Sequence, residues 1–381
     1  MKSEKSGAHS WATIIMFCAL IGTLAPATFI LPKKEFSETE NRFLAEFPVL
    51  TAERISSGEF SSEFETYLAD HFVWRDGWVK MKTAAERLML KTESKDIYFA
   101  KDGYLIEKHS GAFTSDTARR NIAFLSQFES MYKEQFGGRL SVMIVPNAVS
   151  ILRGKLPPFA SPYNEDLYLE EIQNALSAGS YFDADSVLKH HADEELFYKS
   201  DHHWKTRAAL YVYQAWAAAQ GFRVPKASDF DIVTASENFQ GTTQSKLGVQ
   251  TDGDTIELFL PKTEIAYTVK KGDAEAERSL YDCSALETKD KYAVYFGGNF
   301  ARVHIETERK NGRAALVIKD SYANCFVPFM LGEFESVDVV DLRYTNQRLS
   351  QTIERGGYTD ILVLYNAAGF AEDRSVAKLV R

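Results

Sequence analysis

The sequence predicts an α/β fold in which helices cover both faces of a parallel sheet, giving three α/β/α layers. Short apolar runs rich in branched side chains suit strands buried on both faces, and they lie at 140–147, 314–319, 337–341 and 361–366. Segments with helical spacing alternate with these runs, at 117–136, 166–178, 206–220 and 322–331. The chain has 381 residues, 45% of them hydrophobic, so it can bury a core larger than that of one average domain.

The chain begins with a membrane-directed segment. Residues 11–31 carry no charged side chain, and Lys33 and Lys34 follow them closely. A helix of this length can cross a bilayer. A cleaved signal peptide is the main alternative, because Ala25-Pro26-Ala27 resembles a cleavage site. The apolar run continues beyond that site to Leu31, which favours an uncleaved signal anchor.

These observations predict the division of the chain. Residues 1–10 form a cytoplasmic tail, and the single membrane pass at 11–31 places the rest outside the cytoplasm. Apolar residues at helical spacing then predict a helical neck at 32–95. The α/β domain occupies 96–381. Residues at about 222–312 fit the alternation of strands and helices poorly and predict a β-rich insertion.

Cysteine use is sparse. Cys283 and Cys325 are the pair available to a domain outside the membrane segment, since Cys18 lies within it. Two free thiols are the commoner interpretation of such a distant pair, and a disulfide is the other.

Composition excludes some classes of function. The net charge of −9 and the pI of about 5.5 argue against a general affinity for nucleic acid, which needs a basic face. The sequence has no Gly-x-Gly-x-x-Gly and no Walker-type loop, so no cofactor is expected.

The densest group of chemically active side chains is Asp201-His202-His203-Trp204. An imidazole can move protons near neutral pH when a carboxylate fixes its tautomer and stabilises its charged form. Asp201 and His203 could supply that pair, which then needs a nucleophile.

Ser321 is the best candidate for the nucleophile. It follows the apolar run 314–319 and precedes a helix-compatible stretch, and active sites gather where strands end and helices begin. Its alternative is a helix N-cap, a role that serine often fills. Asn366 also ends an apolar run, where it points into the same crevice or serves as a turn residue.

A metal site is a different interpretation of the histidines. The pairs His190-His191 and His202-His203 flank Asp193 and Glu194, and imidazole and carboxylate suit several divalent ions. Adjacent residues on a helix or strand point in different directions, so the four rings cannot easily converge. We therefore expect no metal.

Several motifs together carry a family resemblance. The sequence resembles the DHHW-motif proteins, which are similar to the SGNH-hydrolase-like proteins of alginate and other exopolysaccharide O-acetylation. The resemblance extends from about Asn41 to the C-terminus, and its motifs occur in the same order: Asn41–Leu44, Val145–Asn147, Asp201–Trp204, Asp252–Ile256, Asp320–Phe329 and Leu364–Asn366.

The resemblance implies an SGNH-hydrolase-like, flavodoxin-like domain with a Ser-His-Asp triad. Ser321 falls on the nucleophile, His203 on the base and Asp201 on its partner, which leaves His202 without a catalytic assignment. Asn366 falls on the asparagine of the oxyanion hole, and Gly298 is a looser match for a second donor. The family's usual Gly-Asp-Ser signature reads Lys319-Asp320-Ser321 here.

The resemblance further implies an O-acetyltransferase that modifies a cell-surface polysaccharide, with the acyl group supplied by a multispanning membrane acyltransferase. An esterase is the alternative if water accepts the acyl group. A noncatalytic polysaccharide-binding or assembly protein also stays open, because fold does not fix function.

Overall fold

The computed structural model describes residues 3–37 and 42–381. The start of the predicted resemblance at Asn41 and the first two residues of the predicted tail lie outside these ranges. The chain forms two compact units, one comprising 1–90 with 245–249 and the other 91–244 with 250–381.

The smaller unit is mainly helical. Its elements are α1 (Ser3–Ile30), β1 (Phe36–Ser37), β2 (Arg42–Phe43), α2 (Ala52–Ser56), α3 (Glu59–His71) and α4 (Arg75–Leu88). At the end of α3, Asp70 Oδ2 accepts the N–H of Ala45 at 2.9 Å, and His71 Nε2 lies 2.9 Å from the carbonyl oxygen of Ala45. These two side chains therefore fasten the loop before α2.

Helix α1 contains the apolar segment. Over Ser10–Ile30 it is long and apolar enough to cross a membrane, a property that a signal sequence near the N-terminus shares.

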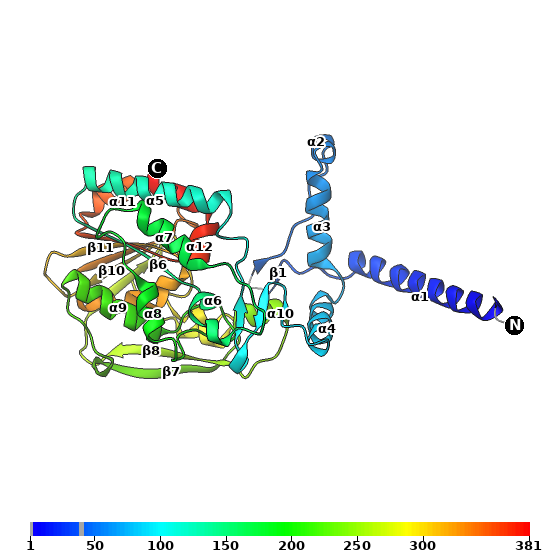
Figure 1. Ribbon diagram of the computed structural model, residues 1–381. Coiled ribbons are helices and arrows are strands. Elements are labelled where there is room, and N and C mark those ends of the chain that lie inside the picture. Colours follow the sequence, from blue (N-terminus) through cyan, green and yellow to red (C-terminus); the bar gives the residue numbers. More distant parts are fainter. Residues whose placement is uncertain (1–2, 38–41) are drawn as a thin grey trace. The chain divides into compact units, whose positions relative to one another are not determined.

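The larger unit is built on a six-stranded sheet (Figure 1). In spatial order its strands are β6 (Arg139–Val145), β13 (Asp360–Asn366), β11 (Ala314–Lys319), β12 (Ser336–Val340), β10 (Arg302–Thr307) and β9 (Tyr267–Lys271). The first four are mutually parallel, whereas β10 and β9 are antiparallel to their neighbours.

The fully parallel sheet predicted from the sequence is thus a mixed one. The chain arrives at β10 from a loop at the carboxyl edge of the parallel strands, because Arg302 at the start of β10 pairs with Val340 at the end of β12. A strand that starts at this edge runs back across the sheet, and only a long crossover would have made it parallel.

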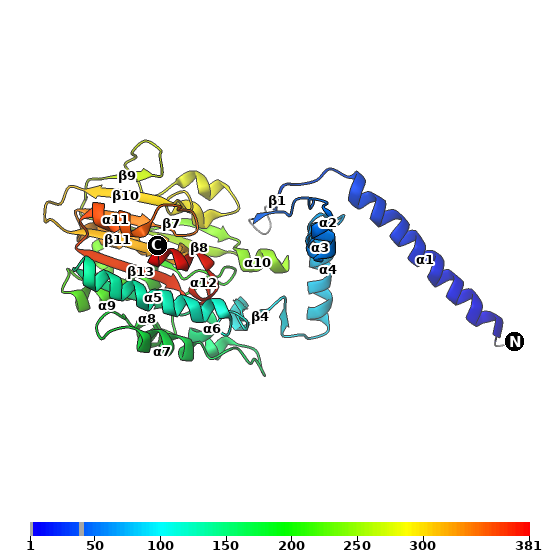
Figure 2. The same cartoon turned by 90° about the horizontal axis from the view of Figure 1, so that it is seen from above.

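Hydrophobic side chains are buried on both faces of the sheet. In β13, Ile361, Val363 and Tyr365 join one core, while Leu362 and Leu364 join the other. Figures 1 and 2 show helices on both sides. One core includes residues of α5 (Asp116–Gln135), α7 (Glu165–Ala175), α11 (Leu349–Gly356) and α12 (Ala367–Glu372), and the other includes residues of α8 (Ala184–His190) and α9 (Thr206–Gln220).

Shorter elements complete the larger unit. A β-ribbon is formed by β7 (Phe230–Phe239) and β8 (Asp254–Pro261). A small sheet is formed by β3 (Glu93–Ser94), β4 (Ile97–Phe99) and β5 (Leu105–Glu107). The remaining helices of the larger unit are α6 (Ala148–Ile151) and the 3-10 turns η1 (Lys101–Gly103), η2 (Arg153–Lys155), η3 (Ala227–Asp229), η4 (Cys283–Glu287), η5 (Lys291–Val294) and η8 (Arg374–Val380). Helix α10 (Thr242–Leu247) begins in this unit, and its last three residues belong to the smaller one.

The helix expected at 322–331 is instead two 3-10 helices, η6 (Ser321–Cys325) and η7 (Val327–Gly332). Pro328 lies near the start of η7, and its missing N–H and fixed ring disfavour one continuous α-helix. Cys283 and Cys325 are both free thiols, the first exposed and the second buried.

A buried polar network follows the ends of β6 and β13. The Asn147 N–H donates to Glu165 Oε1 at 2.7 Å, and the Asn147 side-chain amide donates to Asn366 Oδ1 at 3.0 Å. Glu165 has no exposed surface, and among the described residues its Oε2 has no hydrogen-bond partner. Burial raises the pKa of Glu165 from 4.5 to about 8, although the bond from Asn147 opposes this shift. Glu165 is therefore protonated at neutral pH.

We expect α1 to hold the full-length protein in membranes through carbonate extraction. Replacing Ile21 with arginine should weaken this retention, because an arginine at the centre of a spanning helix costs about 3 kcal/mol. Fractionation of both proteins checks the result. A soluble wild-type product that begins near Thr28 would show cleavage instead.

The buried Glu165 predicts a pH-dependent stability. Its folded-state pKa is the higher one, so the stability it contributes is fully present below about pH 4.5 and is lost as the pH rises to about 8. Glu165→Gln keeps the acceptor for Asn147 and should remove a penalty on the order of 3 kcal/mol at pH 7. Urea unfolding of both proteins at pH 5 and pH 7.5 measures this difference in the free energy of unfolding.

The exposed Glu171 on the same helix supplies the control. Glu171→Gln should show the wild-type dependence of the free energy of unfolding on pH. If this free energy changes equally with pH in all three proteins, the prediction is wrong.

Candidate active site

The Asp201–Trp204 stretch is a bend between two anchored segments. Phe197 and Trp204 form a β-bridge across it, and α9 begins at Thr206. The Asp254 carboxylate accepts hydrogen bonds from the N–H groups of Lys199 and Ser200, each at 2.8 Å. The start of β8 thus fixes the chain just before Asp201.

Asp201 is buried and stabilises its own turn. Its Oδ1 accepts the backbone N–H of His203 at 2.9 Å, and its Oδ2 accepts the N–H and the hydroxyl of Thr242 at 2.8 and 3.0 Å. A Cβ atom on Gly241 would lie 2.2 Å from the Cβ of Asp201. Only glycine therefore allows the 241–242 turn to approach this closely.

The His203 ring connects Asp201 to Ser321. Its Nδ1 lies 2.5 Å from Asp201 Oδ1, and its Nε2 lies 2.7 Å from Ser321 Oγ, although His203 and Ser321 are 118 residues apart in sequence. Ser321 is partly buried, whereas His203 and Asp201 are buried. A hydroxyl, an imidazole and a carboxylate therefore form a continuous hydrogen-bonded row that ends at the partly buried Ser321.

Burial and charge act in opposite directions on Asp201. Burial alone would favour its neutral form, but His202 and His203, together with the hydrogen bonds from His203 and Thr242, outweigh burial and hold the pKa of Asp201 well below its usual range. An ionised Asp201 can stabilise a positive charge on His203.

Two aromatic residues tie the bend to the turn that carries Ser321. Trp204 Nε1 donates to the carbonyl oxygen of Tyr322 at 2.9 Å, and the Tyr322 hydroxyl donates to the carbonyl oxygen of His202 at 2.7 Å. Their rings stack with centroids 5.4 Å apart. This reciprocal contact holds His203 within reach of Ser321.

A third aromatic residue closes the inner side of the row. The Tyr292 ring stacks on His203 with centroids 3.8 Å apart, and its hydroxyl donates to the Ser321 carbonyl oxygen at 3.2 Å. The stacking restricts rotation of the imidazole.

The structure assigns N-capping of η6 to Asp320 rather than Ser321. Asp320 Oδ1 accepts the Tyr322 N–H at 2.9 Å, which leaves the Ser321 hydroxyl for His203. Burial raises the pKa of Asp320 to about 6, opposed by Arg343 and by the hydrogen bonds from Asn366 and Tyr322.

The two predicted oxyanion-hole residues lie in different settings. Asn366 caps α12 by accepting the Gly369 N–H at 2.7 Å, and its side-chain amide donates to Asp320 Oδ2 at 2.6 Å. Gly298 lies in a turn with φ of 119°, and its N–H donates to the Tyr295 carbonyl oxygen at 3.3 Å. Asn366 thus adjoins the residue before Ser321, and the oxyanion role of both residues stays a prediction.

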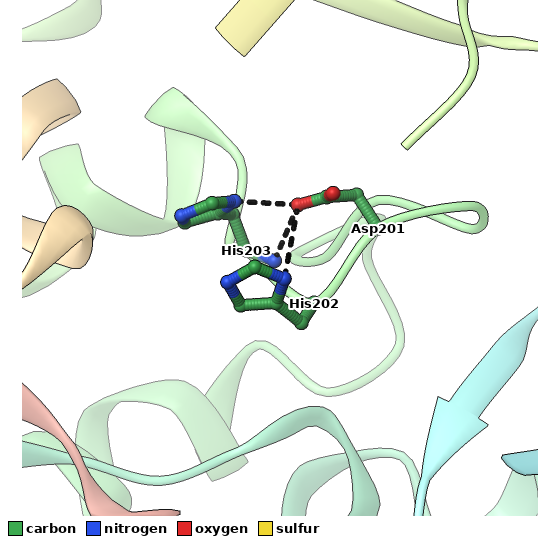
Figure 3. Close-up of side chains that lie close together, drawn as sticks. All are labelled: Asp201, His202 and His203. Atoms are coloured by element: carbon green, nitrogen blue, oxygen red, sulfur yellow. Dashed lines mark hydrogen bonds and ion pairs between the residues drawn. The ribbon is translucent and has the colours of Figure 1, made fainter. Parts of the chain in front are cut away.

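Figure 3 shows Asp201, His202 and His203 together, with one possible ligand atom from each lying within 4.8 Å of the others. His203 Nδ1 faces Asp201 and Nε2 faces Ser321, so an ion bound by this ring would displace one of these contacts. His202 Nδ1 lies 2.8 Å from Thr242 Oγ1, whereas His191 Nδ1 lies 2.8 Å from Glu194 Oε1. The two histidine pairs therefore have separate partners.

Sequence reasoning missed the residues that support the row: Gly241, Thr242, Asp254 and Tyr292. Each is at least about 40 residues from the side chain it holds, so no periodic pattern marks it. The order of the motifs gave one signal, because Asp254 belongs to the Asp252–Ile256 motif.

Comparisons with known proteins identify a similar family and similar folds. A model of the family described as DHHW protein matches residues 166–340. A solved DHHW family protein from Eubacterium siraeum is 25% identical, with a TM-score of 0.60, and the match covers 75% of this chain and 95% of that one. The comparison with curated proteins gives no match.

Two other solved structures are similar at lower identity. Bacillus cereus PatB1 with a sulfonyl adduct is 22% identical, with a TM-score of 0.62 and coverage of 75% of this chain and 98% of that one. The O-acetyltransferase domain of Pseudomonas putida AlgJ is 13% identical, with a TM-score of 0.45 and coverage of 74% and 98%. The family model and the Eubacterium siraeum structure confirm the predicted resemblance to the DHHW-motif proteins, and the region matched by the model contains Asp201, His203 and Ser321.

Proposed function

We propose that the protein is a membrane-anchored, extracytoplasmic O-acetyltransferase that modifies a cell-surface polysaccharide through Ser321, His203 and Asp201. The observation that carries the proposal is the 2.7 Å contact between His203 Nε2 and Ser321 Oγ, with Asp201 at the other ring nitrogen. The resemblance to the DHHW proteins and the helices on both faces of the sheet support an SGNH-like domain for this chemistry.

The proposed reaction has two acyl-transfer steps. His203 Nε2 takes the hydroxyl proton as Ser321 Oγ attacks the carbonyl carbon of a donor ester. The imidazolium returns the proton to the leaving alkoxide, which leaves an acetyl-serine. A sugar hydroxyl then gives its proton to His203 and attacks this ester, and Ser321 regains the proton as the acetylated sugar leaves.

The tetrahedral intermediates place a negative charge on the former carbonyl oxygen. Backbone N–H groups or side-chain amides aimed at that position stabilise it. We assign this role to Asn366 and Gly298, at the end of β13 and in the 297–299 turn.

The donor of the acyl group follows from the proposed location. A domain outside the cytoplasm cannot reach acetyl-CoA directly, so a multispanning membrane acyltransferase supplies the acetyl group. If water replaces the sugar hydroxyl in the second step, the same residues make an esterase. Comparing transfer with hydrolysis therefore distinguishes the two outcomes.

Substitutions in the row should abolish activity without unfolding the protein. Ser321→Ala and His203→Ala should each lower acetyl transfer by a factor on the order of 10⁴ or more, since such residues act as a unit. Asp201→Asn should give a loss on the order of 10⁴, because it presents the wrong partner to the imidazole. Acetyl-ester turnover and transfer to short oligosaccharides measure the losses, and thermal melts measure folding.

His191→Ala is the matched control, because His191 contacts Glu194 and Tyr211 instead. It should retain wild-type activity. A folded Ser321→Ala protein with wild-type activity would refute the nucleophile assignment. A wild-type protein that binds polysaccharide but neither turns over esters nor transfers acetyl groups would support the noncatalytic interpretation.

Chelation separates the proposed enzyme from a metal protein. Because the Ser321–His203 contact needs no ion, a chelator should leave acetyl-ester turnover unchanged, while a sulfonyl fluoride should label Ser321. Mass spectrometry of the labelled peptide checks this outcome, with Ser321→Ala as the unlabelled control. Activity that is lost on chelation and restored by a divalent ion would favour the cluster of Asp201, His202 and His203 as a metal site.

A further inference from the structure

Lys319 is a buried lysine two residues before Ser321. It ends β11, is 2% exposed, and occupies the position of the glycine in the Gly-Asp-Ser signature. Its Nζ donates to Asn299 Oδ1 at 2.7 Å and to Asn324 Oδ1 at 2.9 Å, and lies 3.4 Å from Asp341 Oδ2. The buried ammonium group of Lys319 thus interacts with three specific side chains.

These partners come from three separate segments around the candidate site. Asn324 belongs to η6, which begins at Ser321, and Asp341 directly follows β12. Asn299 follows Gly297 and Gly298, whose φ angles of 82° and 119° lie in the left-handed region. Lys319 therefore links the glycine turn to the helix that carries the proposed nucleophile.

The charge of Lys319 is balanced but costly. Burial lowers its pKa to about 8, opposed by Asp341 and Asp320, while Arg343 adds to the lowering. Asp341 already has a paired cation, because Arg343 Nε and Nη2 donate to its two oxygens at 2.9 and 2.6 Å. A buried ion pair often contributes less stability than apolar side chains of similar volume. The stability of the fold alone therefore does not account for a charged lysine at this buried position.

We propose that Lys319 is a positioning residue that holds the 297–299 turn, and with it the Gly298 assigned to the oxyanion hole, against the Ser321 turn. The inference rests on the proposed function and adds to it a residue that touches no reacting atom. It also explains the departure from Gly-Asp-Ser, since a glycine at this position has no side chain to reach Asn299.

The contact between the 291–299 segment and Ser321 supports this role. Tyr292, at the start of the segment, reaches the Ser321 carbonyl oxygen, and Asn299, at its end, lies 3.4 Å from the Asn324 amide nitrogen. The segment therefore meets η6 at two points. Asn299 is itself exposed, so its link to the buried Lys319 is what fixes the far end of the turn.

A double-mutant cycle tests the proposal in the full-length protein. Lys319→Met and Asn299→Ala should each lower kcat for a small acetyl ester roughly 10- to 100-fold while KM changes less than about twofold, because misplaced donors act in the transition state. The double variant should be no slower than the slower single variant, since both substitutions remove one link. Thermal melts should stay near wild type, because Arg343 still pairs with Asp341.

Lys310→Met is the matched control, because Lys310 is 69% exposed and pairs with surface glutamates. It should leave kcat unchanged. If Lys319→Met does not fold, Asn299→Ala tests the proposal by itself, because Asn299 is exposed. Wild-type kcat in Asn299→Ala, or losses that multiply in the double variant, would overturn the proposal. Activity in Ser321→Ala would instead refute the proposed function, so the two failures are distinguishable.

Discussion

The buried carboxylate of Asp201 is the constraint on which the site depends. An ionised group inside a protein is costly unless its oxygens accept hydrogen bonds, and this one takes them from the backbone and ring of His203 and from two groups of Thr242. Those bonds oblige the 201–203 bend and the 241–242 turn to meet. Gly241 permits the approach because a side chain there would overlap Asp201. The hydrogen bonds that stabilise the buried Asp201 carboxylate thus also fix the orientation of the His203 imidazole.

A second constraint joins this bend to the sheet. Buried indole and phenol groups need hydrogen-bond partners, and Trp204 and Tyr322 each find a carbonyl oxygen on the other's segment. Each aromatic residue therefore contributes apolar area to the core and fixes the distance between two loops. The resulting placement of His203 opposite Ser321 lies at the carboxyl edge of the parallel strands, where open α/β sheets gather their binding residues.

The sequence predicted those parts of the molecule that local patterns determine. Residues 315–318 of β11 are apolar and buried, so this short run marked a strand and placed Ser321 just beyond its end. The antiparallel β10 was not predicted, because its residues alternate between buried and exposed and the direction of a strand depends on where the loop before it lies. Thr242 as a partner of Asp201 and Asn299 as a partner of Lys319 were also missed. Folding makes these two contacts across 41 and 20 residues, and no spacing rule predicts them.

Three consecutive residues, 319–321, organise the other half of the site. Successive side chains at a strand end point in different directions, so each reaches a different segment: the first Asn299, the second Asn366 and the third His203. A slip of one residue in the register of β11 would misdirect all three contacts together. The parallel neighbours β12 and β13 pair with β11 along its length and hold that register. The precision of the candidate site is therefore supplied by the sheet, and the loops are anchored to it through these three side chains.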